Sequence, residues 1–287
     1  MAEYKSFYKV VGGNEGSKCH YPARLDLYGC GCEHDCKYCY AKSLLNFRKL
    51  WNPMAPSVAD LAKVQRRIRK LEPGTTVRLG GMTDCFMPSE KIKRVTYHAI
   101  QMLNEHGNPY LIVTKSAMVA DPEYLRIMDH TLAHIQVTVT TLNDDFCSTY
   151  EKASRPSERI RAILKLQEEG FDVAIRLSPY IPQFWLGDLH KLKGYGIRKA
   201  LVEFLRVNAW IRKWFKLDYS EYSVKQGGYC HMPLDRKVEY ILPLLGMFPE
   251  LTVCEDETEA YNYWRDHVNP NPEDCCNLRR TPWGGES

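Results

Sequence analysis

Gly31-Cys-Glu-His-Asp-Cys-Lys-Tyr-Cys-Tyr40 is the stretch that decides how the chain is interpreted. Its cysteines, Cys32, Cys36 and Cys39, follow a C-x3-C-x2-C spacing, and Tyr38 precedes the last of them. Iron–sulfur clusters are held by cysteine thiolates, usually four. Three thiolates can hold three corners of a [4Fe–4S] cube and leave the fourth iron open for a ligand, as catalytic metal sites do. We therefore expect a metal centre with an open coordination position here.

Two other interpretations of these cysteines have to be weighed. Zinc sites usually show two C-x2-C pairs, or one pair with histidines at finger spacing. Cys30 and His34 stand close enough in sequence to offer further ligands, so zinc stays open at this point. A disulfide framework is typical of short secreted chains and does not suit 287 residues.

Length and composition set the broad class. A chain of 287 residues suits one large α/β domain with an appendage, or two small domains. A hydrophobic fraction of 44% is enough for a real core, and a net charge of +4 permits a polyanionic partner without requiring one. The cysteine trio must stay reduced to bind iron, which predicts a cytoplasmic location. The amino-terminus has no signal-peptide core and no long apolar stretch follows, so we expect no membrane association.

Strand and helix patterns alternate along the chain. Hydrophobic periodicity and breakers predict strands at 24–28, 76–79, 110–114, 135–141, 171–177 and 199–207, with helices between them. Such alternation predicts a parallel sheet with right-handed crossovers, with reactive groups at the carboxyl ends of the strands. We expect an amino-terminal arm at 1–23, the α/β domain at 24–207 and a carboxyl-terminal extension at 208–287, where this rhythm stops.

Four further motifs follow predicted strands. They are Arg78-Leu-Gly-Gly-Met-Thr-Asp-Cys-Phe-Met-Pro-Ser-Glu90, Ile112-Val-Thr-Lys-Ser116, Val137-Thr-Val-Thr-Thr-Leu-Asn143 and Ala174-Ile-Arg-Leu-Ser-Pro-Tyr-Ile-Pro182. Paired glycines let the backbone approach a ligand closely. A period of two puts Thr138 and Thr140 on one strand face, although β propensity alone also explains threonines there.

Together with the cysteine trio, these motifs resemble the radical S-adenosylmethionine (SAM) superfamily. The Gly-Gly-x-Thr-Asp and Val-Thr-Lys runs narrow the resemblance to the branch that includes spore photoproduct lyase. The resemblance implies a partial (β/α)6 TIM-like barrel in which the trio binds a [4Fe–4S] cluster. SAM then binds the open iron and is cleaved reductively to a 5′-deoxyadenosyl radical, which abstracts a hydrogen atom from the substrate.

The same resemblance assigns SAM contacts to particular residues. Lys115 is expected to pair with the SAM carboxylate, since a lysine–carboxylate hydrogen bond is strong in a partly dry pocket. Thr140 is expected at the carboxylate or ribose, and Arg176 and Ser178 at the adenosine or the substrate. The remaining expected contacts to the cofactor are Tyr38, Gly80, Gly81, Thr83 and Asp84.

The resemblance to this branch implies a nucleic-acid substrate, and a thymine or modified thymine in DNA is the substrate we expect. It also implies an electron donor, a reductase or a flavodoxin-like protein. One position departs from the repair enzyme, which carries a hydrogen-donating cysteine immediately before the SAM-contacting hydroxyl. Here Met82 occupies that place, before Thr83. Cys85 is the nearest thiol and Tyr229 a phenol that could relay hydrogen, so both are candidate catalytic residues. The departure favours base modification or rearrangement over lesion repair.

The extension carries four more cysteines and an aromatic run. Cys230, Cys254, Cys275 and Cys276 could form a second iron–sulfur or zinc site, although cysteine is also a common core residue. The run Arg206-Val-Asn-Ala-Trp-Ile-Arg-Lys-Trp-Phe-Lys216 interleaves cations with Trp210, Trp214 and Phe215. It suits contacts to phosphates and stacked bases, or an amphipathic helix with buried aromatics.

Two rival functions remain open on the sequence. One is a radical SAM enzyme for a small metabolite or a peptide, which would not bind DNA. The other is a non-catalytic protein with a zinc-bound loop.

Overall fold

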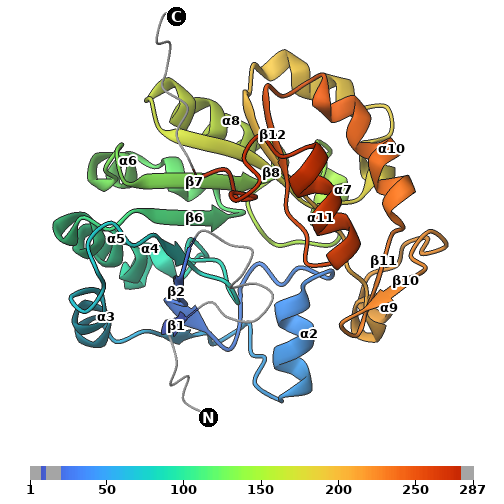
Figure 1. The fold of residues 1–287 in the computed structure, drawn as a ribbon. Coiled ribbons are helices and arrows are strands. Elements are labelled where there is room, and N and C mark those ends of the chain that lie inside the picture. Colours follow the sequence, from blue (N-terminus) through green and yellow to red (C-terminus); the bar gives the residue numbers. More distant parts are fainter. Residues whose placement is uncertain (1–7, 11–20, 279–287) are drawn as a thin grey trace, which may run out of the picture.

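The computed structural model describes residues 8–10 and 21–278, and its centre is an eight-stranded sheet (Figure 1). Seven strands are parallel and lie side by side in chain order. They are β2 (Ala23–Leu25), β5 (Val77–Leu79), β6 (Tyr110–Thr114), β7 (Ala133–Thr138), β8 (Asp172–Tyr180), β9 (Lys199–Phe204) and β12 (Glu250–Val253). The antiparallel β1 (Tyr8–Val10) flanks β2 at one edge. The prediction of an α/β fold with a parallel sheet is confirmed, and the arrangement agrees with a partial TIM-like barrel.

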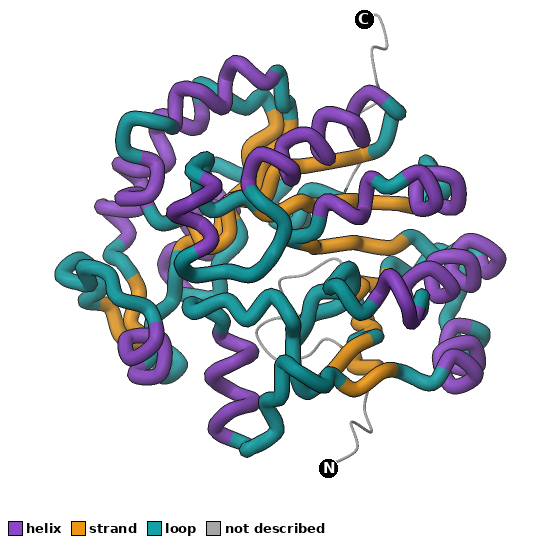
Figure 2. The backbone as a smooth tube through the Cα atoms, turned by 180° about the vertical axis from the view of Figure 1, so that it is seen from behind, coloured by secondary structure: helices purple, strands orange, loops and turns teal. Residues whose placement is uncertain are grey.

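Helices connect the strands and cover the outer face of the sheet, as the view from behind shows (Figure 2). The crossovers contain α3 (Leu61–Ile68), α4 (Glu90–Lys93), α5 (Val95–His106), α6 (Pro122–Ile127), α7 (Asp144–Ser148), α8 (Pro156–Glu168) and α10 (Leu234–Leu245). Short 3-10 turns lie at Ala117–Ala120, Pro182–Trp185 and Leu189–Tyr195. The helix starts follow the sequence signals: Pro122 and Pro156 each occupy the first turn, where a missing N–H costs nothing.

The cysteine stretch lies in the first crossover, between β2 and β5. It follows β3 (Tyr28–Gly29), which pairs with β4 (Ser57–Val58), and it runs directly into α2 (Tyr40–Phe47). The loop therefore starts and ends on regular elements.

The carboxyl-terminal extension is part of the same sheet, which differs from the expected end of the strand–helix rhythm at 207. Lys199 of β9 pairs with Glu250 of β12, so 199–207 does not hold the last strand. The short run Leu251-Thr-Val253 is apolar and β-branched, and it was not recognised as a strand. The extension also contains α9 (Ala209–Trp214), the hairpin of β10 (Val224–Gln226) and β11 (Tyr229–His231), and α11 (Thr258–His267). Most of the expected arm at 1–23 lies outside the described residues.

Candidate active site

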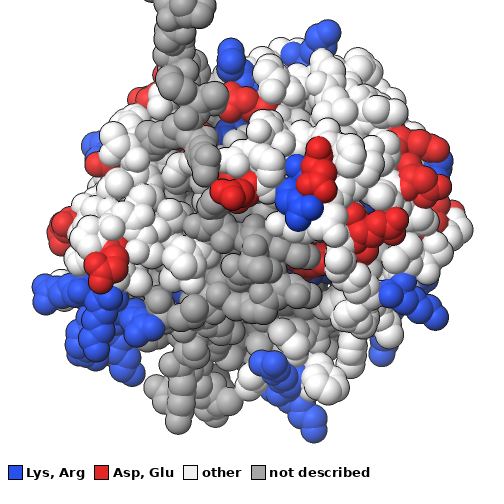
Figure 3. Space-filling model, in the orientation of Figure 1, with Lys and Arg blue, Asp and Glu red and all other residues white. Residues whose placement is uncertain are grey.

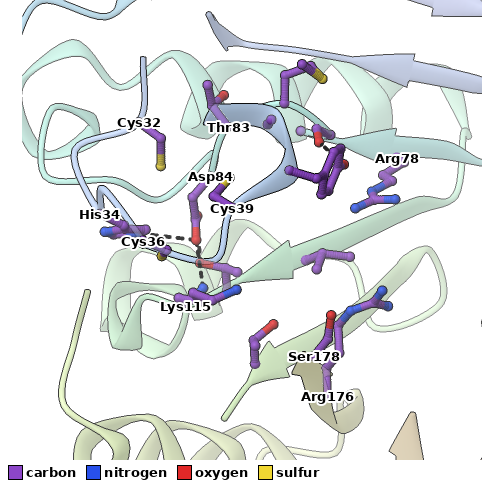
Figure 4. Close-up of a pocket in the computed structure, with 18 of the residues that line it drawn as sticks. Cys32, His34, Cys36, Cys39, Arg78, Thr83, Asp84, Lys115, Arg176 and Ser178 are labelled. Atoms are coloured by element: carbon purple, nitrogen blue, oxygen red, sulfur yellow. Dashed lines mark hydrogen bonds and ion pairs between the residues drawn. The ribbon is translucent and has the colours of Figure 1, made fainter. Parts of the chain in front are cut away.

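A pocket opens at the carboxyl ends of the parallel strands, beside the cysteine loop (Figure 4). The loop forms one wall, and the rest comes from residues of β5, β6, β7, β8 and β9 and from the segments that follow β5 and β6. The polar and thiol side chains that line it include Cys32, His34, Cys36, Cys39, Tyr40, Arg78, Thr83, Asp84, Thr114, Lys115, Thr138, Arg176, Ser178 and Glu203.

The cysteine loop is held in a compact turn. The Asp35 N–H donates to the Cys32 carbonyl at 3.0 Å, and Asp35 has a positive φ of 41°. Cys39 caps α2, because its Sγ accepts from the Lys42 N–H at 3.4 Å. Gly31 is required by close packing: a Cβ there would lie 2.0 Å from the Asn52 carbonyl oxygen. Local backbone contacts therefore aim the thiols into the pocket.

The donor set of this loop fits an iron–sulfur cube. Burial raises the pKa of the Cys32 thiol to about 12 and also raises those of Cys36 and Cys39, so a bound metal has to supply the charge that makes them thiolates. Among the described residues, the group that brings three potential ligand atoms within 4.8 Å of one another lies elsewhere in the chain. At least one pair of the loop sulfurs is therefore more than 4.8 Å apart, which suits a cube, since each thiolate binds a different iron.

Asp84 connects the loop to the strand ends. One carboxylate oxygen accepts from the Thr114 hydroxyl at 2.8 Å and from the Phe86 N–H, and the other accepts from the Lys115 N–H at 2.7 Å. His34 Nε2 lies 3.2 Å from the second oxygen, and both contacts of this oxygen are drawn in Figure 4. Burial alone would raise the pKa of Asp84, but His34 and these hydrogen bonds lower it to about 2. Asp84 faces the pocket as expected, yet its contacts position protein groups.

A buried charged wall stands behind Cys36. Glu151 and Arg159 are fully buried and form an ion pair at 3.0 Å, and a Glu151 oxygen lies 4.0 Å from the Cys36 sulfur. The Thr140 hydroxyl donates to Glu151 at 2.5 Å and lies 3.0 Å from the Tyr150 hydroxyl. Thr140 therefore belongs to this wall and does not line the pocket, contrary to expectation. β7 ends at Thr138, so the alternation that would have placed both threonines alike stops there, and Thr138 alone lines the pocket.

The paired glycines make a tight turn at the end of β5. Gly80 has a φ of +79°, and a Cβ on it would lie 2.7 Å from the Thr83 carbonyl oxygen. Tyr40 donates its hydroxyl to the Gly81 carbonyl at 2.6 Å, and Thr83 donates to the Tyr28 carbonyl at 2.7 Å. Both glycines line the pocket, so that backbone without side chains forms this part of its wall.

Lys115 and Tyr38 contact each other beside the cysteine loop. Lys115 lines the pocket, and its Nζ lies 5.6 Å from the centre of the Tyr38 ring. Tyr38 is buried behind the loop and packs edge-on against Phe215 at 5.7 Å. The Tyr38 ring is part of the aromatic core, and its expected contact to the cofactor stays a prediction.

The wall opposite the loop is a charged network on β8 and β9. Glu203 Oε2 accepts from Arg176 at 2.6 Å and from the Ser178 hydroxyl at 2.8 Å. Burial would raise the pKa of Glu203, but the charges of Arg176 and Arg206 and these hydrogen bonds lower it to about 2. The Arg206 guanidinium lies 4.5 Å from the centre of the Tyr40 ring. Glu203 and Tyr40 were not predicted as site residues, and Arg206 was predicted only as part of the cationic and aromatic run. For Glu203, a lone carboxylate in the apolar strand β9 was the available signal.

The two candidate catalytic residues lie away from the pocket surface. Cys85 is 1% exposed and packs in the main hydrophobic core, so the structure argues against its role as a hydrogen donor. Tyr229 lies on β11, and its ring centre is 5.5 Å from the guanidinium of Arg206, which also contacts Tyr40. The residues that follow Cys85, Phe86 and Met87, are apolar and fully buried, and Cys85 packs in the same core cluster.

Three of the four extension cysteines come together. Cys254, Cys275 and Cys276 place their sulfurs within 4.8 Å of one another. Cys230 instead sits in the β10–β11 hairpin, where its backbone pairs with Val207. The expected four-cysteine set is therefore reduced to three.

The fold and the site define an α/β protein with a three-thiol metal loop at the carboxyl end of a parallel sheet. The model of the radical SAM superfamily matches residues 27–184, more than half of the chain. The chain belongs to the radical SAM superfamily, whose members bind a [4Fe–4S] cluster and SAM. The expectation drawn from the motifs is confirmed at this level, and the non-catalytic zinc protein is set aside.

Individual relatives are more distant. An uncharacterised protein of Methanocaldococcus jannaschii is 26% identical over 162 residues, covering 53% of this chain and 58% of that protein. The chain thus spans less than two thirds of this curated relative.

Solved structures share the fold at low sequence identity. Spore photoproduct lyase complexed with dinucleoside spore photoproduct has a TM-score of 0.63 and 16% identity, covering 88% of this chain and 80% of the lyase. The structure of anSMEcpe with bound AdoMet has a TM-score of 0.51 and 10% identity. The match covers 78% of this chain and 59% of the anSMEcpe chain. In residues 8–10 and 21–278, no helix is both long and apolar enough to cross a membrane.

Proposed function

We propose that this radical SAM enzyme acts on a base in nucleic acid, specifically a thymine or modified thymine in DNA. The likeness to spore photoproduct lyase, solved with a dinucleoside photoproduct, supports this substrate class. The observation that carries the proposal is an aromatic and cationic surface that this chain builds beside the cysteine loop.

That surface lies where α9 meets α2. The Trp210 and Trp214 rings lie 5.5 Å apart, and Lys42 Nζ lies 5.1 Å from the centre of the Trp214 ring. Asn208 fixes α9 to α2 by donating to the Ser43 hydroxyl at 3.0 Å. Trp210 is 37% exposed, so its face is available for stacking. Base–aromatic stacking beside a cation is a common mode of binding single-stranded or flipped bases.

Only part of the aromatic run serves this surface. Phe215 is buried and packs on Tyr38, as the amphipathic-helix alternative expects. A second basic region lies over α3, where exposed lysines and arginines gather on the face shown in Figure 3. Arg66, Arg69 and Lys70 are exposed there. Such a patch attracts phosphates without reading bases.

The pocket residues take distinct roles in this proposal. A [4Fe–4S] cluster on Cys32, Cys36 and Cys39, together with SAM, supplies the adenosyl radical that removes a hydrogen atom from the substrate. Lys115 neutralises the carboxylate of SAM, and the Gly80–Gly81 backbone approaches its amino group. Arg176, Ser178 and Glu203 form the polar wall available to the ribose. The buried walls behind these groups exclude water, which is the main contribution of the protein when a cofactor carries the chemistry.

The thiols on the pocket wall favour modification over repair. Within the described part of the chain, the cysteines that line the pocket are the three of the loop, and Met82 lines the pocket where the repair enzyme has its hydrogen donor. We infer that the substrate radical rearranges or is resolved without a protein thiol. A reductase or flavodoxin-like protein would supply the electron.

Anaerobic incubation of DNA with the reduced enzyme and SAM tests this function, read out by mass spectrometry of the nucleosides. We expect a thymine-derived nucleoside whose formation requires SAM. Trp210→Ala with Trp214→Ala should weaken binding of single-stranded DNA by about tenfold or more. Phe47→Ala is the control, because Phe47 is exposed at the far end of α2. Turnover of a small metabolite or peptide without salt-dependent DNA binding would overturn the proposal.

A further inference from the structure

The carboxyl-terminal cysteines meet on the inner face of the sheet, beside the pocket. Cys254 directly follows β12, and Cys275 and Cys276 lie after α11. Their buried cluster includes Leu111 of β6 and Leu201 of β9. Leu111 shares its strand face with Val113, and Leu201 with Glu203, and both of these partners line the pocket. The three thiols therefore lie under the pocket wall.

A tight turn presents the two adjacent thiols. The Leu278 N–H donates to the Asp274 carboxylate at 2.7 Å, and the Asn277 N–H donates to the Asp274 carbonyl at 3.0 Å. Gln136 of β7 donates to the Cys276 carbonyl at 2.9 Å, which anchors the turn to the centre of the sheet. Cys275 and Cys276 are only 3% and 4% exposed, so the group is built into the core.

We propose that Cys254, Cys275 and Cys276 bind a single zinc ion. Their sulfurs lie within 4.8 Å of one another, and those of Cys254 and Cys275 are 3.7 Å apart. A tetrahedral zinc with bonds of about 2.3 Å places its sulfur ligands about 3.8 Å from each other. A cube would hold the sulfurs on separate irons, farther apart. A disulfide needs about 2.05 Å between sulfurs, much less than the separation of Cys254 from Cys275.

The surroundings suit the charge of such a site. Three thiolates and one zinc ion carry a net negative charge, and soft thiolates select zinc over harder cations. Burial by itself would lower the pKa of Arg176, but Glu203 and the thiols of Cys254 and Cys276 raise it. Arg176 also donates to Gln136 at 2.6 Å. The ion would thus tie the chain end to β12 beneath the arginine wall of the pocket, as a structural site independent of the substrate.

The site is tested by measuring bound zinc in a variant whose loop lacks its three cysteines. In the full-length C32A/C36A/C39A protein, prepared anaerobically and dialysed against zinc, we expect about one tightly bound zinc per chain by elemental analysis. Adding Cys275→Ser should reduce bound zinc at least tenfold, whereas Cys230→Ser, a thiol in the hairpin, should leave it unchanged. Cobalt(II) in place of zinc should give the intense near-ultraviolet absorption of thiolate coordination, and zinc should remove it.

A measurement on the unaltered thiols covers the case in which the serine variant fails to fold. In the C32A/C36A/C39A protein, zinc should protect Cys254, Cys275 and Cys276 from alkylation, as mapped by mass spectrometry. A chelator should remove that protection. Three results would overturn the proposal: no bound zinc, equal loss in Cys230→Ser, or reconstitution with four irons and sulfide at these residues.

Discussion

The two groups of three cysteines in this chain are built in opposite ways. Cys32, Cys36 and Cys39 come from one short loop, and their sulfurs are spread around a pocket. Cys254, Cys275 and Cys276 come from two distant segments, and their sulfurs converge within 4.8 Å. The loop group suits a multinuclear cluster that meets a ligand, and the converging group suits one buried ion. Sulfur spacing and not cysteine number distinguishes the two sites.

The largest expected effect separates the two groups by function. Cys36→Ala should abolish cluster binding and SAM cleavage, because two thiolates cannot hold the cube. Cys276→Ser should retain the loop cluster and its iron. Iron and sulfide analysis, with 5′-deoxyadenosine formation under reducing conditions, measures both. A cluster that survives Cys36→Ala would contradict the assignment of the loop.

The wall behind the loop gives the next largest effect. Glu151→Gln leaves Arg159 buried without its charge partner, which should destabilise the fold by about 3–5 kcal/mol. Urea unfolding of the metal-free protein measures this. Glu123→Gln is the control, because the side chains of Glu123 and its partner Arg94 are 34% and 35% exposed, and it should cost no more than about 1 kcal/mol. Equal stability of the two variants would show that the wall does not support the loop.

Replacement of Lys115 tests whether its ammonium group binds SAM in the pocket beside the cysteine loop. Lys115→Ala should keep the cluster spectrum and weaken SAM binding by about 10- to 100-fold, the value of one hydrogen bond to a charged group. Equilibrium binding of SAM to the reconstituted protein is the measurement. Lys152→Ala is a matched control, since Lys152 contacts Asp35 of the same loop but its side chain is 67% exposed. Unchanged SAM affinity in Lys115→Ala would refute the role.

Replacement of Glu203 tests the hydrogen-bonded chain that links the two cysteine groups, and its expected effect on stability is the smallest of the four. It contacts Arg176, which binds Gln136, which in turn holds the Cys276 carbonyl. Its pKa of about 2 is depressed, so its stabilisation is present above about pH 4.5 and is lost as the pH falls towards 2. Glu203→Gln should lower the free energy of unfolding by about 1–2 kcal/mol at pH 7. Solvent screening keeps this value small, because the Glu203 side chain is 26% exposed. At pH 3 the loss should be smaller. Thermal unfolding at both pH values checks the sign, and an equal cost at both would contradict it.

The sequence predicted the features that are local. The spacing of the cysteine loop, the glycine pair and the position of Lys115 after β6 could be recognised because each depends on one strand end. The contributions of Glu203, Arg206 and Tyr40 could not, because Tyr40 at the start of α2 is far in sequence from Glu203 and Arg206 and meets them only in the fold. Thr140 was misplaced because the end of β7 was expected three residues later, and Cys85 because apolar neighbours turn it into the core.

The packing of Phe215 on Tyr38 has a consequence for the biosynthesis of the enzyme. The ring that closes the back of the loop is translated 176 residues after Cys39 (215 minus 39). At a ribosome speed of about 5–20 residues per second, that interval lasts roughly 9–35 s. During this time the Tyr38 ring lacks its Phe215 contact, so the packing behind the cysteine loop is completed only after residue 215 has been added to the nascent chain.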